Sequence, residues 1–123
     1  MAWKKLKVSL NFDSTSMDCD GGRVVAQVRV QGETDGGQDD NEYTVFLKDD
    51  YLPPDVLWNS GPRTEPPSQH VDRKFEVELW CNDRCHVSGP AGSSKERVAE
   101  VYAHALSVGR ESQTGEFKIA CRK

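Results

Sequence analysis

The segment RVVAQVRVQ, residues 23–31, has an apolar side chain at every second position from Val24 to Val30, with mostly polar side chains between. Successive side chains of a β-strand point to opposite faces of a sheet, so this segment predicts a strand with one buried and one solvated face. Four further segments alternate in the same way, at residues 3–12, 42–48, 73–81 and 116–122. Together they predict an antiparallel sheet of five or more strands. The last segment is short enough to be compatible with a helix as well.

A helix is predicted over residues 93–109. Ser93 and Glu96 have the spacing of a capping box, and Gly109 is a natural C-terminal stop. The apolar positions between them recur at helical spacing. They are Val98, Val101, Tyr102, Ala105 and Val108. The expected fold class is therefore α+β, an antiparallel sheet with one face covered by a C-terminal helix.

The length of 123 residues predicts a single domain, residues 1–123. The apolar fraction is 36% and the mean hydropathy is −0.70, both low for a compact monomer. A single amphipathic helix is also scant cover for five strands. We therefore expect a homodimer in which the helix of one subunit packs over the sheet of its partner.

Five prolines lie between Asp49 and Asp72, and they exclude a central strand or a regular helix there. We expect a long surface segment anchored by Val56, Leu57 and Trp58. A second connection, residues 32–41, is rich in Gly and Asp and predicts a loop.

The four cysteines suggest no clear metal site. Cys81, Cys85 and His86 have a spacing that zinc tolerates, but no second ligand pair lies nearby in the sequence. Cys81 and Cys121 fall on apolar strand faces, which predicts small core residues, and the redox state of Cys19, Cys81, Cys85 and Cys121 is left open. Structural disulfides are expected only if the protein becomes part of an extracellular particle. The acidic turns 18–21 and 35–40 do not match a calcium-binding loop, and no metal or cofactor is predicted.

No signal of catalysis or of membrane insertion is found in the sequence. It contains no Gly-x-Ser-x-Gly, no phosphate-binding loop and no dinucleotide fingerprint, so we predict a protein that is not an enzyme and has no small-molecule substrate. Its apolar runs are too short for a membrane span or a signal peptide. We therefore expect a cytoplasmic protein without a membrane partner.

The solvated side of the sheet is the remaining candidate site. It combines amides, cations and aromatic rings, a mixture suited to RNA because bases stack on planar groups while cations hold phosphates. The candidate RNA-binding residues are Gln27, Arg29, Thr44, Phe46, Lys48 and Trp80. The alternative is an ordinary solvated face with cross-strand ion pairs.

Three stretches of the chain resemble the coat proteins of single-stranded RNA bacteriophages. Residues 22–31 with 43–48 are similar to the central strand pair of that family, residues 74–79 to its last strand, and residues 93–97 leading into 102–106 to its capped first helix. The resemblance implies a self-assembling capsid protein that dimerises, binds genomic RNA on the polar sheet face and forms an icosahedral virion in the host cytoplasm. In that family the proline-rich stretch 51–71 corresponds to a loop that meets neighbouring subunits.

A second interpretation remains open because acidic residues crowd the predicted loops. The net charge is −4. The acidic loop residues are Asp13, Asp18, Asp20, Glu33, Asp35, Asp39, Asp40 and Glu42. They are compatible with a small cytoplasmic binding protein, of the immunity or anti-defence type, that contacts a basic protein partner.

Overall fold

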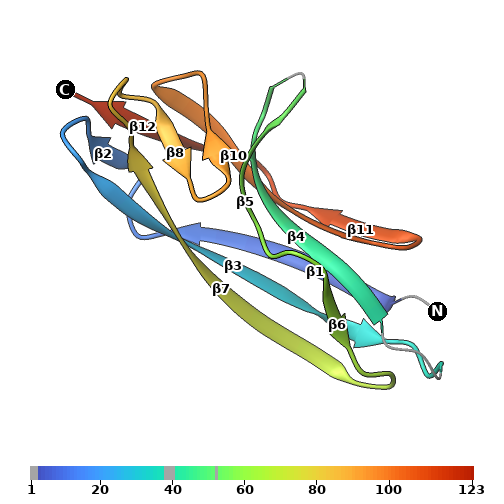
Figure 1. Ribbon diagram of the computed structural model, residues 1–123. Coiled ribbons are helices and arrows are strands. Elements are labelled where there is room, and N and C mark those ends of the chain that lie inside the picture. The colour runs from blue at the N-terminus through green and yellow to red at the C-terminus, as the bar shows by residue number, and fades with distance from the viewer. Residues whose placement is uncertain (1–2, 38–40, 52) are drawn as a thin grey trace.

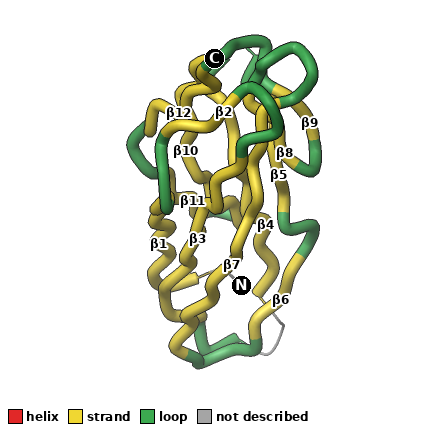
Figure 2. The backbone as a smooth tube through the Cα atoms, turned by 90° about the vertical axis from the view of Figure 1, so that its left-hand side faces the viewer, coloured by secondary structure: helices red, strands yellow, loops and turns green. Residues whose placement is uncertain are grey.

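The computed structural model describes residues 3–37, 41–51 and 53–123, and within these ranges every regular element is a β-strand. The strands form two sheets that pack against each other (Figures 1 and 2). The predicted α+β class is therefore wrong, and the protein is all-β. The predicted helix from a dimer partner is wrong as well, because the second sheet of the same chain covers the buried face of the first.

The first sheet has five strands in the order β1-β3-β7-β8-β9, with every pairing antiparallel. Its strands are β1 (Trp3–Phe12), β3 (Arg23–Thr34), β7 (His70–Cys81), β8 (Val87–Gly89) and β9 (Gly92–Ser93). Three of the predicted strands, at residues 3–12, 23–31 and 73–81, form its long members. The expected pairing of the first two is confirmed, with Val8 opposite Val30.

The second sheet has seven strands. Its main path is β2-β12-β10-β4-β5, while β11 pairs with β10 and β6 pairs with β4. Its strands are β2 (Ser16–Asp18), β4 (Asn41–Asp49), β5 (Asp55–Asn59), β6 (Arg63–Glu65), β10 (Val98–Ser107), β11 (Arg110–Gln113) and β12 (Phe117–Arg122). The pairing of β2 with β12 is parallel and the others are antiparallel. The open question about residues 116–122 is thus answered in favour of a strand.

The order in which the chain visits the two sheets is that of an immunoglobulin-like sandwich. The first, second and fourth of the long strands, β1, β3 and β7, share one sheet, while β4, β10 and β12 share the other. This Greek-key arrangement describes the fold only, since sandwiches of this kind serve many unrelated functions.

The core lies between the sheets, and the period-two pattern correctly identified the side chains that fill it. Large side chains that are fully buried come from both layers: Val24, Val28, Val30, Val77 and Leu79 from the first sheet, and Val45, Leu47, Val101 and Ile119 from the second. Full burial of one such side chain contributes about 1.5–3 kcal/mol to folding. The two inner faces therefore supply each other's apolar cover within one chain.

The predicted helix over residues 93–109 is replaced by the end of β9, a bend, β10 and a tight turn into β11. Ala99, Val101, Ala103 and Ala105 are buried at every second position, as a strand requires. Ser94, not Ser93, accepts a hydrogen bond from the Glu96 backbone N–H at 3.0 Å, and it does so in an irregular bend.

Gly109 ends the strand rather than a helix. It has φ +78° in the two-residue turn between the paired residues Ser107 and Arg110, a conformation that glycine adopts without strain.

The proline-rich segment follows its prediction in part. It contains no central strand, but its residues 55–59 and 63–65 form the short strands β5 and β6, which each pair with β4. Leu57 is fully buried, and Val56 and Trp58 are half-buried, so the predicted anchor is confirmed. The predicted loop 32–41 is also shorter than expected, because β3 runs to Thr34, and residues 38–40 lie outside the described part.

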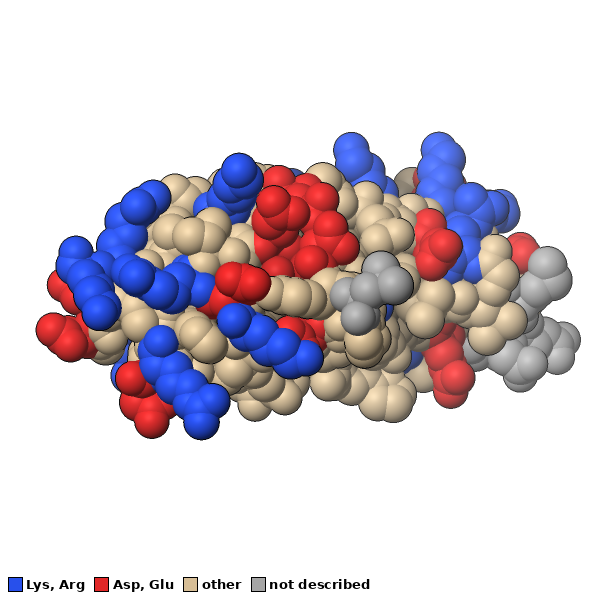
Figure 3. All heavy atoms as spheres, turned by 90° about the horizontal axis from the view of Figure 1, so that it is seen from above, with Lys and Arg blue, Asp and Glu red and all other residues tan. Residues whose placement is uncertain are grey.

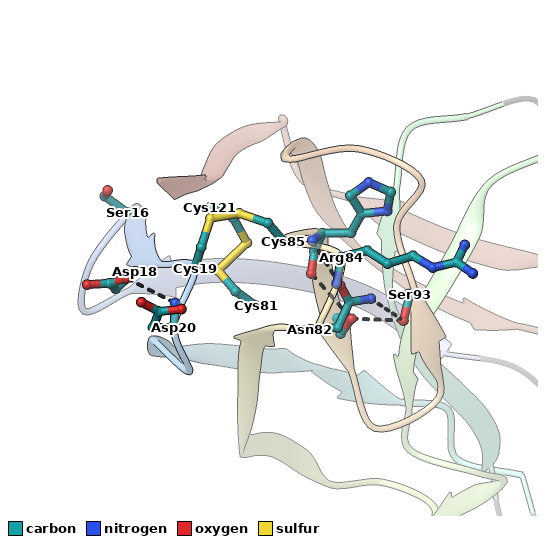
Figure 4. The surroundings of a disulfide bond; sticks show 12 residues. Ser16, Asp18, Cys19, Asp20, Cys81, Asn82, Arg84, Cys85, Ser93 and Cys121 are labelled. Carbon is teal, nitrogen blue, oxygen red and sulfur yellow. Dashed lines mark hydrogen bonds between the residues drawn. A yellow bond between two sulfur atoms is a disulfide. The ribbon is translucent and has the colours of Figure 1, made fainter. Parts of the chain in front are cut away.

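Two disulfides close one end of the sandwich (Figure 4). Cys81–Cys121 joins β7 to β12 and so ties the two sheets together, with 5.8 Å between the Cα atoms. Cys19–Cys85 joins the turn after β2 to the turn after β7, with 4.9 Å between the Cα atoms. Cys81 and Cys121 are buried as predicted, and their redox state, which the sequence left open, is that of a disulfide. Cys81 and Cys121 are 40 residues apart in the sequence, so only the fold brings their sulfur atoms together.

Candidate functional site

The six predicted RNA-binding residues lie on opposite sides of the molecule. Gln27, Arg29 and Trp80 point outward from β3 and β7 of the five-stranded sheet, whereas Thr44, Phe46 and Lys48 point outward from β4 of the seven-stranded sheet. From the sequence, these six positions were expected to share one solvated face of a single sheet. Because the chain builds two sheets, no single surface presents all six, and RNA binding stays a prediction.

The outer face of the five-stranded sheet is charged and largely self-neutralised. Arg29 donates two hydrogen bonds to Asp72, at 2.8 and 2.6 Å, which lower the pKa of the Asp72 carboxyl and raise that of Arg29. Arg23 forms a second ion pair with Glu78 of β7. This is the arrangement of cross-strand ion pairs that the sequence left open as the alternative to RNA binding. Both pairs are half-exposed and contribute little to stability.

The outer face of the seven-stranded sheet, called here the mixed face, has a different character. The described residues include three exposed large hydrophobic side chains, Val98 at 47%, Leu106 at 43% and Val108 at 82% exposure. Val98 and Leu106 belong to β10, and Val108 lies in the turn that follows it. This concentration on one strand and its turn marks the mixed face as the side suited to contact with another protein surface.

A concavity of about 410 Å³ lies beside Leu106 and Val108. Thr44, Tyr43, Glu42, Pro62 and Ser107 complete its wall. Leu106 stands opposite Thr44 in the pairing of β10 with β4, so the concavity opens on the mixed face. We refer to this region as the apolar end of the mixed face.

A chain of polar contacts crosses the middle of the mixed face. His104 Nδ1 lies 3.1 Å from Lys48 Nζ, and His104 Nε2 lies 2.8 Å from a carboxylate oxygen of Glu111. The ammonium of Lys48 donates to Nδ1, so the proton of a neutral His104 ring is on Nε2, where it is donated to Glu111. Lys48 also lies 4.8 Å from the centre of the Phe46 ring. Two of the predicted RNA-binding residues are therefore already engaged with each other and with His104.

Three carboxylates gather where β4, β10 and β12 come together. Oxygen atoms of Asp50, Glu100 and Glu116 lie within 4.8 Å of one another, and all three side chains are exposed. Hydrogen bonding with Asp50, together with burial and the nearby charge of Glu100, raises the pKa of Glu116 to about 7. The space-filling view from above shows acidic side chains gathered near the middle of the molecule, with Lys and Arg side chains toward both ends (Figure 3). The sequence held no signal for this cluster, because its members are distant in the chain.

A basic concavity of about 460 Å³ lies where β10 begins and β12 ends. Its wall is formed by Arg97, Val98, Cys121, Arg122 and Lys123, and all three cationic side chains are exposed. No ion pair joins any of the three to an acidic side chain among the residues that the structure describes. This region is called here the basic end of the mixed face.

The zinc candidates are bound in other ways. Cys81 and Cys85 are both in disulfides, so neither offers a thiolate to a metal. The backbone N–H of His86 donates to Asn82 Oδ1 at 3.0 Å within the turn after β7. In Figure 4 the two disulfides lie side by side next to this turn.

Comparison with protein-family models, curated proteins and solved structures found no match. None of the described segments forms a helix long and apolar enough to cross a membrane. The most distinctive surface of the molecule is the mixed face, with its exposed hydrophobic side chains.

Proposed function

We propose that the protein is a non-enzymatic structural protein that self-associates through the mixed face. The observation that carries this proposal is the position of the three exposed large hydrophobics, which all belong to β10 or its turn. Burying apolar surface is the main source of favourable free energy in protein association. The five-stranded sheet has ion-paired side chains on its outer face, and none of its described residues is an exposed large hydrophobic.

The two disulfides support a role in an extracellular particle. Disulfides persist in oxidising surroundings and are rare in the cytosol. A coat protein that leaves the cell with its particle would meet such surroundings. The proposal keeps the self-assembly that the resemblance implied, but not the resemblance to the phage coat family, because residues 98–107 form strand β10 where that family has a helix.

An assembly larger than a dimer needs more than one contact surface on each copy. The mixed face offers an apolar end at Leu106 and Val108, and a basic end at Val98, separated by most of the length of β10. We assign growth of the assembly to the apolar end.

The test is the molar mass in solution, measured by light scattering after size exclusion over a range of concentrations. The wild-type protein should exceed twice the chain mass of 13.8 kDa, and the double variant Leu106→Ser/Val108→Ser should form a smaller species. Val25→Ser, on the outer face of the five-stranded sheet, is the matched control and should behave as the wild type. A wild-type protein that stays monomeric at every concentration would refute the proposal.

A further inference from the structure

The basic end of the mixed face carries three cations around an exposed apolar side chain. Arg97, Arg122 and Lys123 share the wall of the concavity with Val98, which is 47% exposed. Asp18 is the acidic residue opposite Arg122 in the pairing of β2 with β12, but its carboxylate accepts a hydrogen bond from the Asp20 backbone N–H at 3.0 Å. The cations are thus available to an anionic partner.

The acidic cluster adjoins this basic end along the same strand. Val98 and Glu100 are two residues apart on β10, so their side chains leave the same face of the sheet about 7 Å apart. Glu100 belongs to the cluster with Asp50 and Glu116. The acidic cluster therefore lies next to the three cations of the basic end, with Val98 at the boundary.

We infer that a second copy of this chain docks here in a two-fold dimer centred on Val98. The two-fold axis lies in the plane of contact and crosses β10 at Val98. The rotation therefore places the part of each copy on one side of Val98 against the part of the other copy on the opposite side. The acidic cluster of each copy then faces the Arg97, Arg122 and Lys123 side chains of the other, while the two Val98 side chains meet at the axis. A two-fold contact uses the same patch on both subunits, and this patch is complementary to itself.

Charge complementarity selects a second copy over an unrelated partner. A purely basic or purely acidic partner would match one half of the patch and repel the other half, at a cost in affinity. A copy of this chain brings a basic half to the acidic half and an acidic half to the basic half. Lys118 lies opposite Glu100 in the pairing of β10 with β12, but no ion pair joins the clustered carboxylates to a cation among the described residues, and the contact would supply such partners.

The inference rests on the proposed function but concerns a different contact. Growth of the assembly was assigned to the apolar end of the mixed face, and the dimer is assigned to the opposite end of β10. The experiment therefore uses the Leu106→Ser/Val108→Ser background, in which the apolar contact is weakened. The species that remains there should be a dimer.

Two charge-reversed proteins test the contact in that background. One carries Glu100→Lys and Glu116→Lys, and the other carries Arg97→Glu and Arg122→Glu. Each alone places like charges across the two-fold axis, so each should dissociate about tenfold or more readily than the parent dimer. Mixed in equal amounts, they should form a one-to-one heterodimer, because each reversed patch then meets a complementary one.

The controls separate the contact from effects on folding. Thermal unfolding followed by circular dichroism reports whether each reversed protein is folded. A milder pair of variants carries Glu100→Gln/Glu116→Gln in one protein and Arg97→Gln/Arg122→Gln in the other. Each neutralised variant should weaken the dimer less than charge reversal does. Recovery of the dimer on mixing supports the inference, since a folding defect would not be repaired by a partner.

Two results would overturn it. If the Leu106→Ser/Val108→Ser protein is monomeric while the wild type still assembles, the dimer contact is absent and the proposed function survives. If folded reversed proteins remain apart on mixing, the charge pairing is wrong. A wild-type protein that never associates overturns both proposals together.

Discussion

Glu65 is a buried carboxylate held between two donors at the end of the sandwich opposite the disulfides. Its side chain is 4% exposed and accepts hydrogen bonds from Arg73 at 2.8 and 3.1 Å and from Tyr43 at 2.8 Å. Burial alone would raise the pKa of Glu65, but the bonds from Arg73 and Tyr43 outweigh it, and the pKa is lowered. Burial and the bond to Glu65 also raise the pKa of Tyr43 to about 12. The buried position of Glu65 therefore favours the ionised carboxylate, which accepts hydrogen bonds from Arg73 and Tyr43.

The change Glu65→Gln should lower the free energy of unfolding at neutral pH by about 2–3 kcal/mol, since it removes charged hydrogen bonds in a buried setting. The folded state has the lower pKa, so this contribution is present above the ordinary carboxyl pKa of 4.5 and declines as the pH falls through the folded value. Urea unfolding at neutral and acidic pH measures both effects.

The exposed residue Glu42 provides the control for this prediction, because it lies on the neighbouring strand β4 opposite Thr64. Glu42→Gln should change stability by less than about 0.5 kcal/mol. Equal losses for the two variants at neutral pH would contradict the assignment, as would a Glu65 effect that is unchanged in acid.

At the scale of elements, β10 shows how one apolar pattern can satisfy two periodicities. Val98, Val101 and Ala105 fit the stripe of a helix, but Val101 and Ala105 also fit the buried side of a strand, together with Ala99 and Ala103. Alanine favours helices in isolation, and that local preference is weak against pairing on both edges. Here β4 and β12 pair with β10 and fix it as a strand.

The observed strand and the helix expected from the sequence predict opposite results for a pair of substitutions in this segment. In the strand, Ala103 is fully buried and Val98 is 47% exposed. Ala103→Asp should therefore cost more than about 3 kcal/mol through an unpaired buried charge, while Val98→Thr should cost less than about 1 kcal/mol. Denaturant unfolding at low protein concentration, where self-association does not contribute, gives both values. A helix would reverse the order, with Val98 buried and Ala103 solvated.

At the scale of the whole molecule, the disulfides fasten the two sheets at one end. Each closes a long loop, of 40 residues for Cys81–Cys121 and 66 for Cys19–Cys85. Constraining loops of that length in the unfolded chain is worth about 4 kcal/mol per bond in the chain-entropy description. In a chain with low mean hydropathy, this contribution is a large part of the usual net stability.

Replacing the pair, Cys81→Ala/Cys121→Ala, should lower the free energy of unfolding by about 2–4 kcal/mol and leave the fold intact. Thermal unfolding with and without a reducing agent makes the comparison. The reductant should destabilise the wild type more than the variant, which has one bond fewer to lose. A wild-type melting temperature that does not respond to full reduction would show that the bonds do not contribute.

The sequence predicted the strand faces well and the connections between them poorly. Every inward position of the segments at residues 3–12, 23–31 and 42–48 is buried or half-buried, because alternation is a local property that survives in any sheet. The candidate site was only partly predictable. Gln27 and Phe46 are both outward on their strands, yet they lie on different sheets. The acidic cluster and the basic end depend on residues far apart in the chain and left no local signal.

The sequence by itself determined which side of each strand meets the core, since the order of apolar and polar residues sets that choice directly. It also marked Gly109 as the end of an element, although of a helix, and it excluded a central strand among the prolines. Only the tertiary structure decided that the strands divide into two sheets, that β10 is not a helix and that the cysteines pair. Those outcomes depend on long-range pairing and on the free energy of burying one apolar face against another. The same long-range packing places Val98 between opposite charges on the mixed face.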